Sequence, residues 1–270
     1  MSKHIIITGA ASGIGEHMAF AMLNKGHRVT LCDINADRLQ QLFAEHPRKE
    51  LINLQTLNVT SVSNWQAVIA SSLSAFGDLD YLFNIAGIIT PGFIHKTSIG
   101  DLDRQMDINA KGMMYGAKLA AELMVEQGYG HIINVASLAG VVSASGIAGY
   151  NASKFAVRGF SLAIAADLEA HGVKVTVICP DLVSTPMMEQ QLDYAEESAL
   201  VFSGNKALTV EDTEQAFYMA MQKQPVEILL PFSRGLLAKI GSFFPVFTRY
   251  LAKYLQKKGK AAILSQAKHR

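Results

Sequence analysis

The sequence predicts an α/β fold with a doubly wound parallel sheet of about seven strands. Helices are expected to cover both faces of the sheet, which gives a three-layer αβα architecture. The first observation is a set of short runs such as His4–Thr8 (HIIIT) and Val173–Cys179 (VKVTVIC). Their apolar, often β-branched residues are typical of strands that are buried on both faces. The second is that these runs alternate with helical patterns roughly every 30 residues, which is typical of right-handed βαβ units.

Seven strands are expected in chain order. They are His4–Thr8, Arg28–Cys32, Leu51–Leu57, Tyr81–Asn84, His131–Ser137, Val173–Cys179 and Val226–Leu230. Helices are expected from the glycines after the first strand to Gly26, and over 36–46, 61–76, 101–127 and 150–171. In an open sheet of this kind, ligands bind beyond the carboxyl ends of the strands.

The composition indicates one large folded domain, because half of the 270 residues are hydrophobic and only 17% are charged. We expect a single domain over residues 1–231, a helical extension over 232–258 and a disordered basic tail over 259–270. The net charge of +1 combines −7 in residues 1–224 with +8 in residues 225–270. An acidic body with a basic tail indicates that the tail has a partner or a role of its own.

Location and redox state are inferred from what the chain carries. Cys32 and Cys179 lie in apolar, strand-like runs and are expected to be buried free thiols. No signal peptide is visible and no apolar run reaches about 18 residues, so we expect a cytoplasmic protein, with peripheral membrane attachment as the alternative.

A glycine-rich turn follows the first strand, with Gly9, Gly13 and Gly15 in the stretch TGAASGIG. Gly9 allows a tight turn, while Gly13 and Gly15 let the backbone approach a pyrophosphate and let the helix pack on the sheet. The N–H groups at a helix N-terminus favour an anion at this place. The turn therefore predicts a dinucleotide site; an ordinary glycine-rich turn is the alternative.

Asp33 ends the second strand, 18 residues after Gly15. A carboxylate at this position accepts the hydroxyls of an adenosine ribose and repels a 2′-phosphate. Residues 34–36 supply no cation for such a phosphate, so the sequence predicts NAD rather than NADP. The alternative is that Asp33 is a loop acid or a helix N-cap.

Ser137, Tyr150 and Lys154 form a pattern that indicates proton transfer. If Tyr150 begins a helix, Lys154 lies one turn further along the same face, where its cation lowers the pKa of the phenol. A serine hydroxyl from a neighbouring strand can hydrogen-bond a substrate oxygen. By itself, Y-x-x-x-K occurs by chance about 0.5 times in a chain of this composition, so its weight depends on the other motifs.

Five separated stretches together resemble the short-chain dehydrogenases/reductases. They are TGAASGIG at 8–15, NIAG at 84–87, INAKG around Asn109, NVAS ending at Ser137 and YNASK at 150–154. They follow the family's order over residues 4–186, about two thirds of the chain. The resemblance implies a Rossmann-type fold, a nicotinamide cofactor and a homodimer or homotetramer.

The resemblance also implies roles for the matching residues. Tyr150 is expected to be the acid/base that takes the hydroxyl proton during alcohol oxidation and returns it during reduction. Lys154 is expected to lower the pKa of Tyr150 and to bond the cofactor ribose; Ser137 orients the substrate, and Asn109 holds a water that relays the proton. The positions that match cofactor-binding residues are Gly9, Ser12, Gly13, Ile14, Gly15, Asp33, Asn58, Val59, Asn84, Ala86, Gly87, Tyr150, Lys154, Pro180, Val183 and Thr185.

Two positions depart from the family pattern. Asn58-Val59 stands where Asp-Val is common beside the adenine, which keeps an acceptor but no charge. Pro180-Asp181 stands where Pro-Gly is common, and a non-glycine there is expected to need a different backbone angle near the nicotinamide.

Residues 186–208 are expected to close over the substrate as a lid. Apolar and aromatic side chains dominate this lid and the segment 88–94, and they are Met187, Met188, Leu192, Tyr194, Leu200, Val201, Phe202, Ile88, Ile89, Phe93 and Ile94. Such a lining favours a lipophilic alcohol or ketone, such as a steroid, a retinoid, or a long-chain or aromatic compound. Plain lid packing is the alternative. His95 is expected to be a surface residue, with a place on the wall of the substrate cleft as the alternative, and no histidine spacing indicates a metal site.

The extension over 232–258 is more apolar than a solvated helix needs, and Pro245 is expected to divide it into two short helices. Its basic residues leave four interpretations open: an in-plane membrane anchor, packing on the body, a cap on the substrate cleft, or a subunit interface.

The sequence thus predicts an oxidoreductase that moves a hydride between NAD(H) and a secondary alcohol or ketone, with no nucleic acid partner. Two other classes remain: a non-catalytic dinucleotide-binding regulator on the same fold, and a peripheral membrane protein organised by its C-terminal helices.

Overall fold

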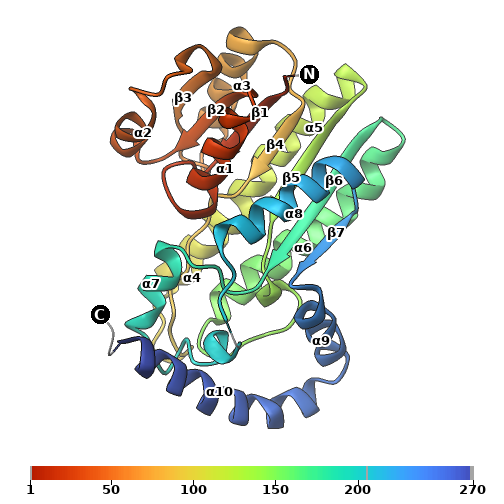
Figure 1. Ribbon diagram of the computed structural model, residues 1–270. Helices are drawn as coiled ribbons and strands as arrows, with labels where there is room; N and C mark the ends of the chain where they lie inside the picture. Colours follow the sequence, from red (N-terminus) through yellow and green to blue (C-terminus); the bar gives the residue numbers. More distant parts are fainter. Residues whose placement is uncertain (1, 205, 268–270) are drawn as a thin grey trace.

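A seven-stranded parallel sheet forms the middle layer of the protein, with the strand order β3-β2-β1-β4-β5-β6-β7 (Figure 1). The computed structural model describes residues 2–204 and 206–267. The strands are β1 (His4–Thr8), β2 (Arg28–Asp33), β3 (Ile52–Thr56), β4 (Tyr81–Asn84), β5 (Gly130–Val135), β6 (Val173–Pro180) and β7 (Glu227–Leu230). The predicted doubly wound α/β fold is confirmed, and each strand bound lies within two residues of its expected place.

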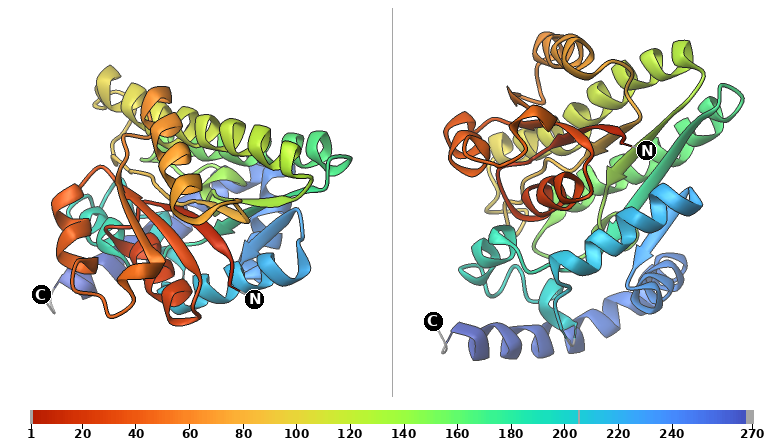
Figure 2. Two further views of the ribbon diagram at one scale, coloured as in Figure 1. Left: turned by 90° about the horizontal axis from the view of Figure 1, so that it is seen from above. Right: turned by 45° about the horizontal axis from the view of Figure 1, so that its top comes forward.

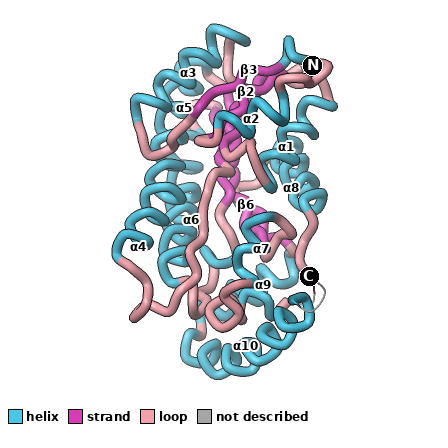
Figure 3. The backbone as a smooth tube through the Cα atoms, turned by 90° about the vertical axis from the view of Figure 1, so that its left-hand side faces the viewer, coloured by secondary structure: helices cyan, strands magenta, loops and turns pink. Residues whose placement is uncertain are grey.

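Helices cover both faces of this sheet (Figures 2 and 3). The helices on one face are α1 (Gly13–Asn24), α2 (Ala36–Phe43) and α8 (Val210–Lys223). Those on the other face are α3 (Val62–Phe76), α4 (Ile99–Gln105), α5 (Met113–Gln127) and α6 (Ala148–Glu169). The last group, near the carboxyl ends of the strands, is α7 (Pro186–Leu192), α9 (Phe232–Phe243) and α10 (Pro245–Ala267). Three short 3₁₀ turns are η1 (Lys49–Leu51), η3 (Leu138–Gly140) and η4 (Val201–Ser203).

Successive side chains along the buried strands point to opposite faces of the sheet, and they form two hydrophobic cores, one on each face. All five residues of β1 are buried. Ile6 points into the core under α3 and α5, whereas Ile5 and Ile7 point into the core under α1 and α8. Because both faces are covered, the strands contain few polar residues, and this is why their pattern in the sequence is clear.

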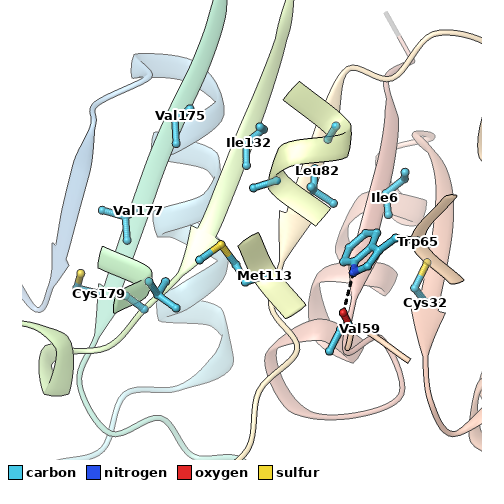
Figure 4. Close-up of a cluster of buried hydrophobic side chains, with 14 of the residues drawn as sticks. Ile6, Cys32, Val59, Trp65, Leu82, Met113, Ile132, Val175, Val177 and Cys179 are labelled. Carbon is cyan, nitrogen blue, oxygen red and sulfur yellow. Dashed lines mark hydrogen bonds between the residues drawn. The ribbon is translucent and has the colours of Figure 1, made fainter. Parts of the chain in front are cut away.

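Trp65 is the largest side chain in the core under α3 and α5 (Figure 4). Its ring is fully buried, and its indole N–H donates to the Val59 carbonyl at 3.0 Å, so its one polar group is satisfied. The adjacent residue of α5 is Gly116, where a Cβ would lie 2.4 Å from the Trp65 ring. The absence of a side chain at Gly116 therefore lets α5 approach Trp65.

The expected helix over 101–127 is interrupted. A π-helical segment, η2 (Met106–Gly112), lies between α4 and α5. At its end Gly112 approaches Val59 so closely that a Cβ would lie 2.7 Å from a Val59 methyl group. The segment carries Asn109, which is buried. Single π turns inside helices are frequent at functional sites.

The C-terminal extension differs from expectation in its length. Pro245 does divide it, but α10 continues to Ala267, so the prediction of a disordered tail from residue 259 is wrong over 259–267. Residues 268–270 lie outside the described part of the chain. Within the described residues, no helix is both long enough and apolar enough to cross a membrane.

We predict that Gly116→Ala lowers the free energy of unfolding by about 1–3 kcal/mol, because the new methyl group overlaps the Trp65 ring. The measurement is urea denaturation followed by circular dichroism. Gly100→Ala is the matched control, since a Cβ there would meet only the Ser98 hydroxyl, at 3.9 Å. Equal stability of the two variants would contradict this account of the contact between α5 and Trp65.

Candidate active site

The glycine turn after β1 has the geometry expected for phosphate binding. Gly9 and Gly13 have φ angles of +71° and +55°, which favour glycine. A Cβ at Gly15 would lie 2.0 Å from the Gly9 carbonyl oxygen. Ser12, at the N-cap of α1, makes no side-chain capping bond, so the first N–H groups of α1 are not capped by it and can bind an anion.

Asp33 stands beside this turn, at the end of β2. One carboxylate oxygen accepts the Ala11 N–H at 3.0 Å, and the other accepts the Asn35 N–H at 2.9 Å. These bonds fix the carboxylate against the glycine turn while leaving it half-exposed. The N-cap of α2 is Asn35, whose side chain accepts the Arg38 N–H, so the alternative that Asp33 caps the helix is wrong.

Three of the predicted cofactor positions already make contacts within the chain. The Asn58 side-chain oxygen accepts both the N–H and the hydroxyl of Thr60, at 3.0 and 2.8 Å, so the acceptor expected to face the adenine is already bonded. Val59 is buried in the core under α3 and α5. The Asn84 amide points into the interior and donates to Asn134 at 2.9 Å, so its side chain joins β4 to β5.

The turn after β4 lies between the glycine turn after β1 and the side chains of Asn109 and Lys154. A Cβ at Gly9 would lie 3.0 Å from the Ala86 Cα, so the turns after β1 and β4 touch. A Cβ at Gly87 would lie 3.2 Å from the Asn109 side-chain oxygen and 3.5 Å from Lys154 Nζ. Gly87 therefore leaves space for these two polar groups.

Ser137, Tyr150 and Lys154 meet at this place, as their spacing predicts. Ser137 follows β5, while Tyr150 and Lys154 occupy the first turns of α6. The Ser137 hydroxyl hydrogen-bonds the Tyr150 phenol, and it also accepts the Ala139 N–H at 3.0 Å. Lys154 Nζ lies 5.7 Å from the centre of the Tyr150 ring and donates to the Val135 carbonyl at 2.9 Å.

The protonation of this group differs from the expectation. Burial raises the pKa of Tyr150 to about 12, and the hydrogen bond from Ser137 is the effect that lowers it. Burial lowers the pKa of Lys154 to about 8. The predicted lowering of the Tyr150 pKa is therefore not present in the protein alone, where loss of solvation outweighs the favourable interactions.

The Asn109 side chain joins the segment after β4 to α6 by hydrogen bonds. Its oxygen accepts the Ile88 N–H at 2.7 Å, and its nitrogen donates to the Ile88 carbonyl at 2.8 Å and to the Ser153 hydroxyl at 3.0 Å. Because the side-chain oxygen and nitrogen of Asn109 are already hydrogen-bonded within the chain, a relay water at Asn109 would have to be held by its main-chain carbonyl.

Ser137, Tyr150 and Lys154 line a cavity of about 900 Å³, whereas Asn109 is not among its lining residues. Five of the predicted cofactor positions also line it: Ile14, Gly87, Pro180, Val183 and Thr185. The outer wall is apolar, and its members come from the lid and from the C-terminal extension: Met187, Met188, Leu200, Val201, Leu237, Ile240, Phe244 and Leu255.

Not every predicted lining residue reaches this cavity. Ile89 does, whereas Ile94 and Tyr194 are exposed and Phe202 is buried in packing. His95 is exposed and stacks on Phe93, as expected for a surface residue. Among the described residues, no group of His, Cys, Asp and Glu side chains could hold a metal ion.

Asp181 explains one departure from the family pattern. Gln224 is the only non-glycine residue of the described chain with a positive φ, so the unusual backbone angle expected at Asp181 is absent. The carboxylate of Asp181 instead forms an ion pair with Arg234 of α9, which lines the cavity. Burial raises the pKa of Asp181, and Arg234 opposes this shift. The pair fixes α9 at the rim of the cavity and neutralises Arg234.

The sequence interpretation missed the contact between α10 and the lid. At Gly259, α10 passes so close to the lid that a Cβ would lie 1.7 Å from the Ala199 carbonyl oxygen. Lys260 pairs with Glu196 of the lid at 2.7 Å, and Ile263 is 1% exposed. A lone glycine within a helical pattern was the available signal. The lid is thus held from outside by α10.

The strand order, with a glycine turn where the order reverses, defines a Rossmann-type nucleotide-binding fold. The model of the short chain dehydrogenases matches residues 3–195. The chain belongs to this family.

Relatives of known activity are about one third identical to this chain. A 2-(R)-hydroxypropyl-CoM dehydrogenase of Xanthobacter autotrophicus is 32% identical over 73% of this chain and 80% of its own length. A 3-alpha-(or 20-beta)-hydroxysteroid dehydrogenase of Mycobacterium tuberculosis is 32% identical over 82% of this chain and 83% of its own. A cyclopentanol dehydrogenase of Comamonas testosteroni is 35% identical over 75% and 81%.

Solved structures agree with this fold. A short chain dehydrogenase/reductase from Burkholderia phymatum in complex with NAD has a TM-score of 0.74 and 28% identity, covering 84% of this chain and 88% of its own. ElxO with NADP bound has a TM-score of 0.75 and 25% identity, covering 85% and 97%.

We predict that Asp181→Ala speeds amide hydrogen exchange in residues 232–243 by about tenfold, because α9 loses the partner of a half-buried arginine. Exchange in α5 should not change. Asp167→Ala, which removes an exposed acid from α6, is the control. Unchanged exchange in α9 would show that the ion pair does not hold this helix.

Proposed function

We propose that the protein is an NAD(H)-dependent oxidoreductase that interconverts a lipophilic secondary alcohol and its ketone. The observation that carries this proposal is the meeting of Ser137, Tyr150 and Lys154 at a cavity of about 900 Å³ that also reaches the nicotinamide-side positions Thr185 and Val183. The family relatives that are named as dehydrogenases support it.

The residues present fit a nicotinamide dinucleotide. The glycine turn offers a cradle that a Cβ at Gly15 would fill, and Asp33 is oriented beside it. ElxO with NADP bound and the Burkholderia phymatum protein in complex with NAD are similar structures, which supports a nicotinamide cofactor. When bound, the cofactor supplies a carbon that accepts or donates a hydride, and its oxidised ring brings a positive charge.

Tyr150 moves the proton in the proposed reaction. In oxidation its phenolate takes the proton of the substrate hydroxyl, and in reduction its phenol gives the proton back. A phenol with a pKa of about 12 is almost entirely protonated at neutral pH, so little phenolate is present to act as the base. Positive charge from the cofactor and from Lys154 must therefore favour the phenolate. With substrate bound, Ser137 gives its one hydroxyl proton to the substrate oxygen on which negative charge develops, in place of the hydrogen bond to Tyr150.

The preference for NAD rests on Asp33. Its two backbone hydrogen bonds keep the carboxylate at the end of β2, where it would repel a 2′-phosphate. The basic residue that follows on α2, Arg38, lies 3.9 Å from the Glu16 carboxylate, which offsets its charge.

The preference for a lipophilic substrate rests on the cavity wall. Lid and extension contribute methionine, leucine, isoleucine and phenylalanine side chains, while the one arginine in the wall, Arg234, is paired with Asp181. A substrate carboxylate or phosphate would have to compete with Asp181 for Arg234. One relative is named for hydroxysteroids and another for cyclopentanol, which agrees with an apolar substrate.

The rival proposal of a non-catalytic regulator has less support, because the three groups needed for proton transfer are all in place. Cytoplasmic location and assembly into a homodimer or homotetramer remain predictions. The partly exposed hydrophobic residues of α6, such as Phe155, support a subunit contact on that face.

We predict that Tyr150→Phe lowers kcat/KM for a hydrophobic secondary alcohol by about 10²–10⁴-fold, because the proton acceptor is lost. The Kd for NADH, measured by fluorescence, should change by no more than about twofold, since the substitution removes a neutral hydroxyl group and no charged group that binds the cofactor. Tyr194→Phe, on the exposed part of the lid, is the matched control. Turnover retained by Tyr150→Phe would refute the acid/base role.

We predict that Asp33→Ala weakens NAD binding by about 10–100-fold and reduces discrimination against NADP, because hydrogen bonds to a charged group are lost together with its repulsion of a phosphate. Titration calorimetry with both cofactors measures the two effects. Asp37→Ala removes the same charge from an exposed position four residues later and should change neither affinity. An unaltered NAD/NADP ratio in Asp33→Ala would contradict the ribose contact.

A further inference from the structure

The C-terminal helices carry a large exposed hydrophobic surface. Of the nineteen large hydrophobic side chains that are exposed in the described part of the chain, ten lie between residues 232 and 264. They are Phe232, Leu236, Leu237, Ile240, Phe243, Phe244, Val246, Tyr250, Tyr254 and Leu264. Soluble monomers rarely concentrate apolar residues in this way, and such patches mark interaction sites.

The two faces of α10 serve different purposes. Its inner face, with Leu255, Gly259 and Ile263, packs on the cavity and the lid. Its outer face carries Tyr250 and Tyr254, which are 66% and 69% exposed. Packing within this chain therefore accounts for the inner face and leaves the outer face turned to the surroundings.

Positive charge accompanies this surface. Residues 228–270 contain nine Lys and Arg and no Asp or Glu. Some of these cations are paired with acids of the body, as in the pair between Lys260 and Glu196. Lys253 and Lys257, in contrast, are exposed on α10 among the tyrosines. Apolar and aromatic side chains with lysines between them are the composition that binds an anionic lipid surface in the plane of the membrane.

A second copy of this chain fits the same surface poorly. In a two-fold contact, each copy presents the same patch to the other, so Lys253 and Lys257 would face their own counterparts with no acid on α9 or α10 to separate them. Like charges placed opposite each other oppose association. An anionic lipid surface supplies the missing negative charge.

The cavity opens on this same surface. Leu237, Ile240 and Phe244 line the cavity and are also 67%, 49% and 63% exposed. The apolar wall therefore continues from the catalytic cavity to the outside between α9 and α10. Both helices lie at one end of the molecule, beyond the carboxyl ends of the strands (Figure 1).

We propose that α9 and the outer face of α10 dock on an anionic membrane surface, and that this docking places the mouth of the substrate cavity against the lipid. A lipophilic substrate then enters the cavity from the bilayer without crossing water. The docking itself depends only on the helices, whereas the entry route rests on the proposed dehydrogenase function.

The test is flotation of the full chain with vesicles of phosphatidylcholine alone or mixed with phosphatidylglycerol. We expect binding to the mixed vesicles, at least tenfold weaker binding to the neutral ones, and loss of binding as salt screens the lysines. The double variant Phe243→Ser/Val246→Ser, whose positions do not line the cavity, should bind mixed vesicles at least tenfold less. Lys253→Gln/Lys257→Gln should lose the preference for anionic lipid.

A matched control removes exposed apolar residues elsewhere. Val62→Ser/Ile99→Ser changes two exposed side chains on α3 and α4 and should leave vesicle binding unchanged. Vesicle binding by the double variant of α9–α10 equal to that of the natural chain would overturn the proposal. So would a chain that ignores vesicles and changes from dimer to monomer in light scattering when Phe243 and Val246 are replaced.

Turnover separates the two proposals. A water-soluble secondary alcohol should be oxidised equally by the natural chain and by Phe243→Ser/Val246→Ser, while a substrate supplied in vesicles should be oxidised at least tenfold more slowly by the variant. Vesicle binding without any turnover would contradict the proposed function and leave the docking intact. Equal rates by both proteins on the vesicle-borne substrate would overturn the entry route.

Discussion

The buried amino group of Lys154 is the constraint on which the candidate active site depends. It is 4% exposed, donates to the Val135 carbonyl at the end of β5, and lies against Gly87 and close to Tyr150. Removing an ammonium ion from water costs several kcal/mol, and the lowered pKa of about 8 expresses this cost. Because the folded pKa lies below the unfolded one, the contribution of Lys154 to stability is least favourable below pH 8 and improves as the pH rises toward 10.5. The hydrogen bond to the Val135 carbonyl and the missing side chain at Gly87 keep this group in place.

The extension ties the charge distribution of the chain to its architecture. In the sequence, the acidic body and the basic tail are two separate properties of the chain. In the structure, Arg234, Lys239 and Lys260 reach back to Asp181, Glu227 and Glu196, so part of the charge difference joins the extension to the body. Lys253 and Lys257 are exposed on α10. The same segment thus closes the cavity on its inner side and offers a basic, apolar surface on its outer side.

Local patterns predicted the elements whose cause is local. Buried strands such as β1 can be recognised in the sequence as apolar runs, because every residue faces a core. Gly9 and Gly13 can be recognised because their φ angles favour glycine. Features that depend on distant partners were missed. The π segment around Asn109, the use of Asn58 by Thr60, and the ion pair of Asp181 with Arg234 all depend on which residue the fold places opposite. For the same reason the raised pKa of Tyr150 could not be predicted, since burial, not the spacing to Lys154, dominates it.

The central claim is that Tyr150 is the proton acceptor and that bound cofactor is what makes it a base. Ultraviolet titration of tyrosinate, as the difference between the natural chain and Tyr150→Phe, measures the pKa of this one phenol with and without NAD. We expect a Tyr150 pKa of about 12 in the protein alone and a clear decrease when NAD is bound. A Tyr150 pKa that does not change on NAD binding would contradict it.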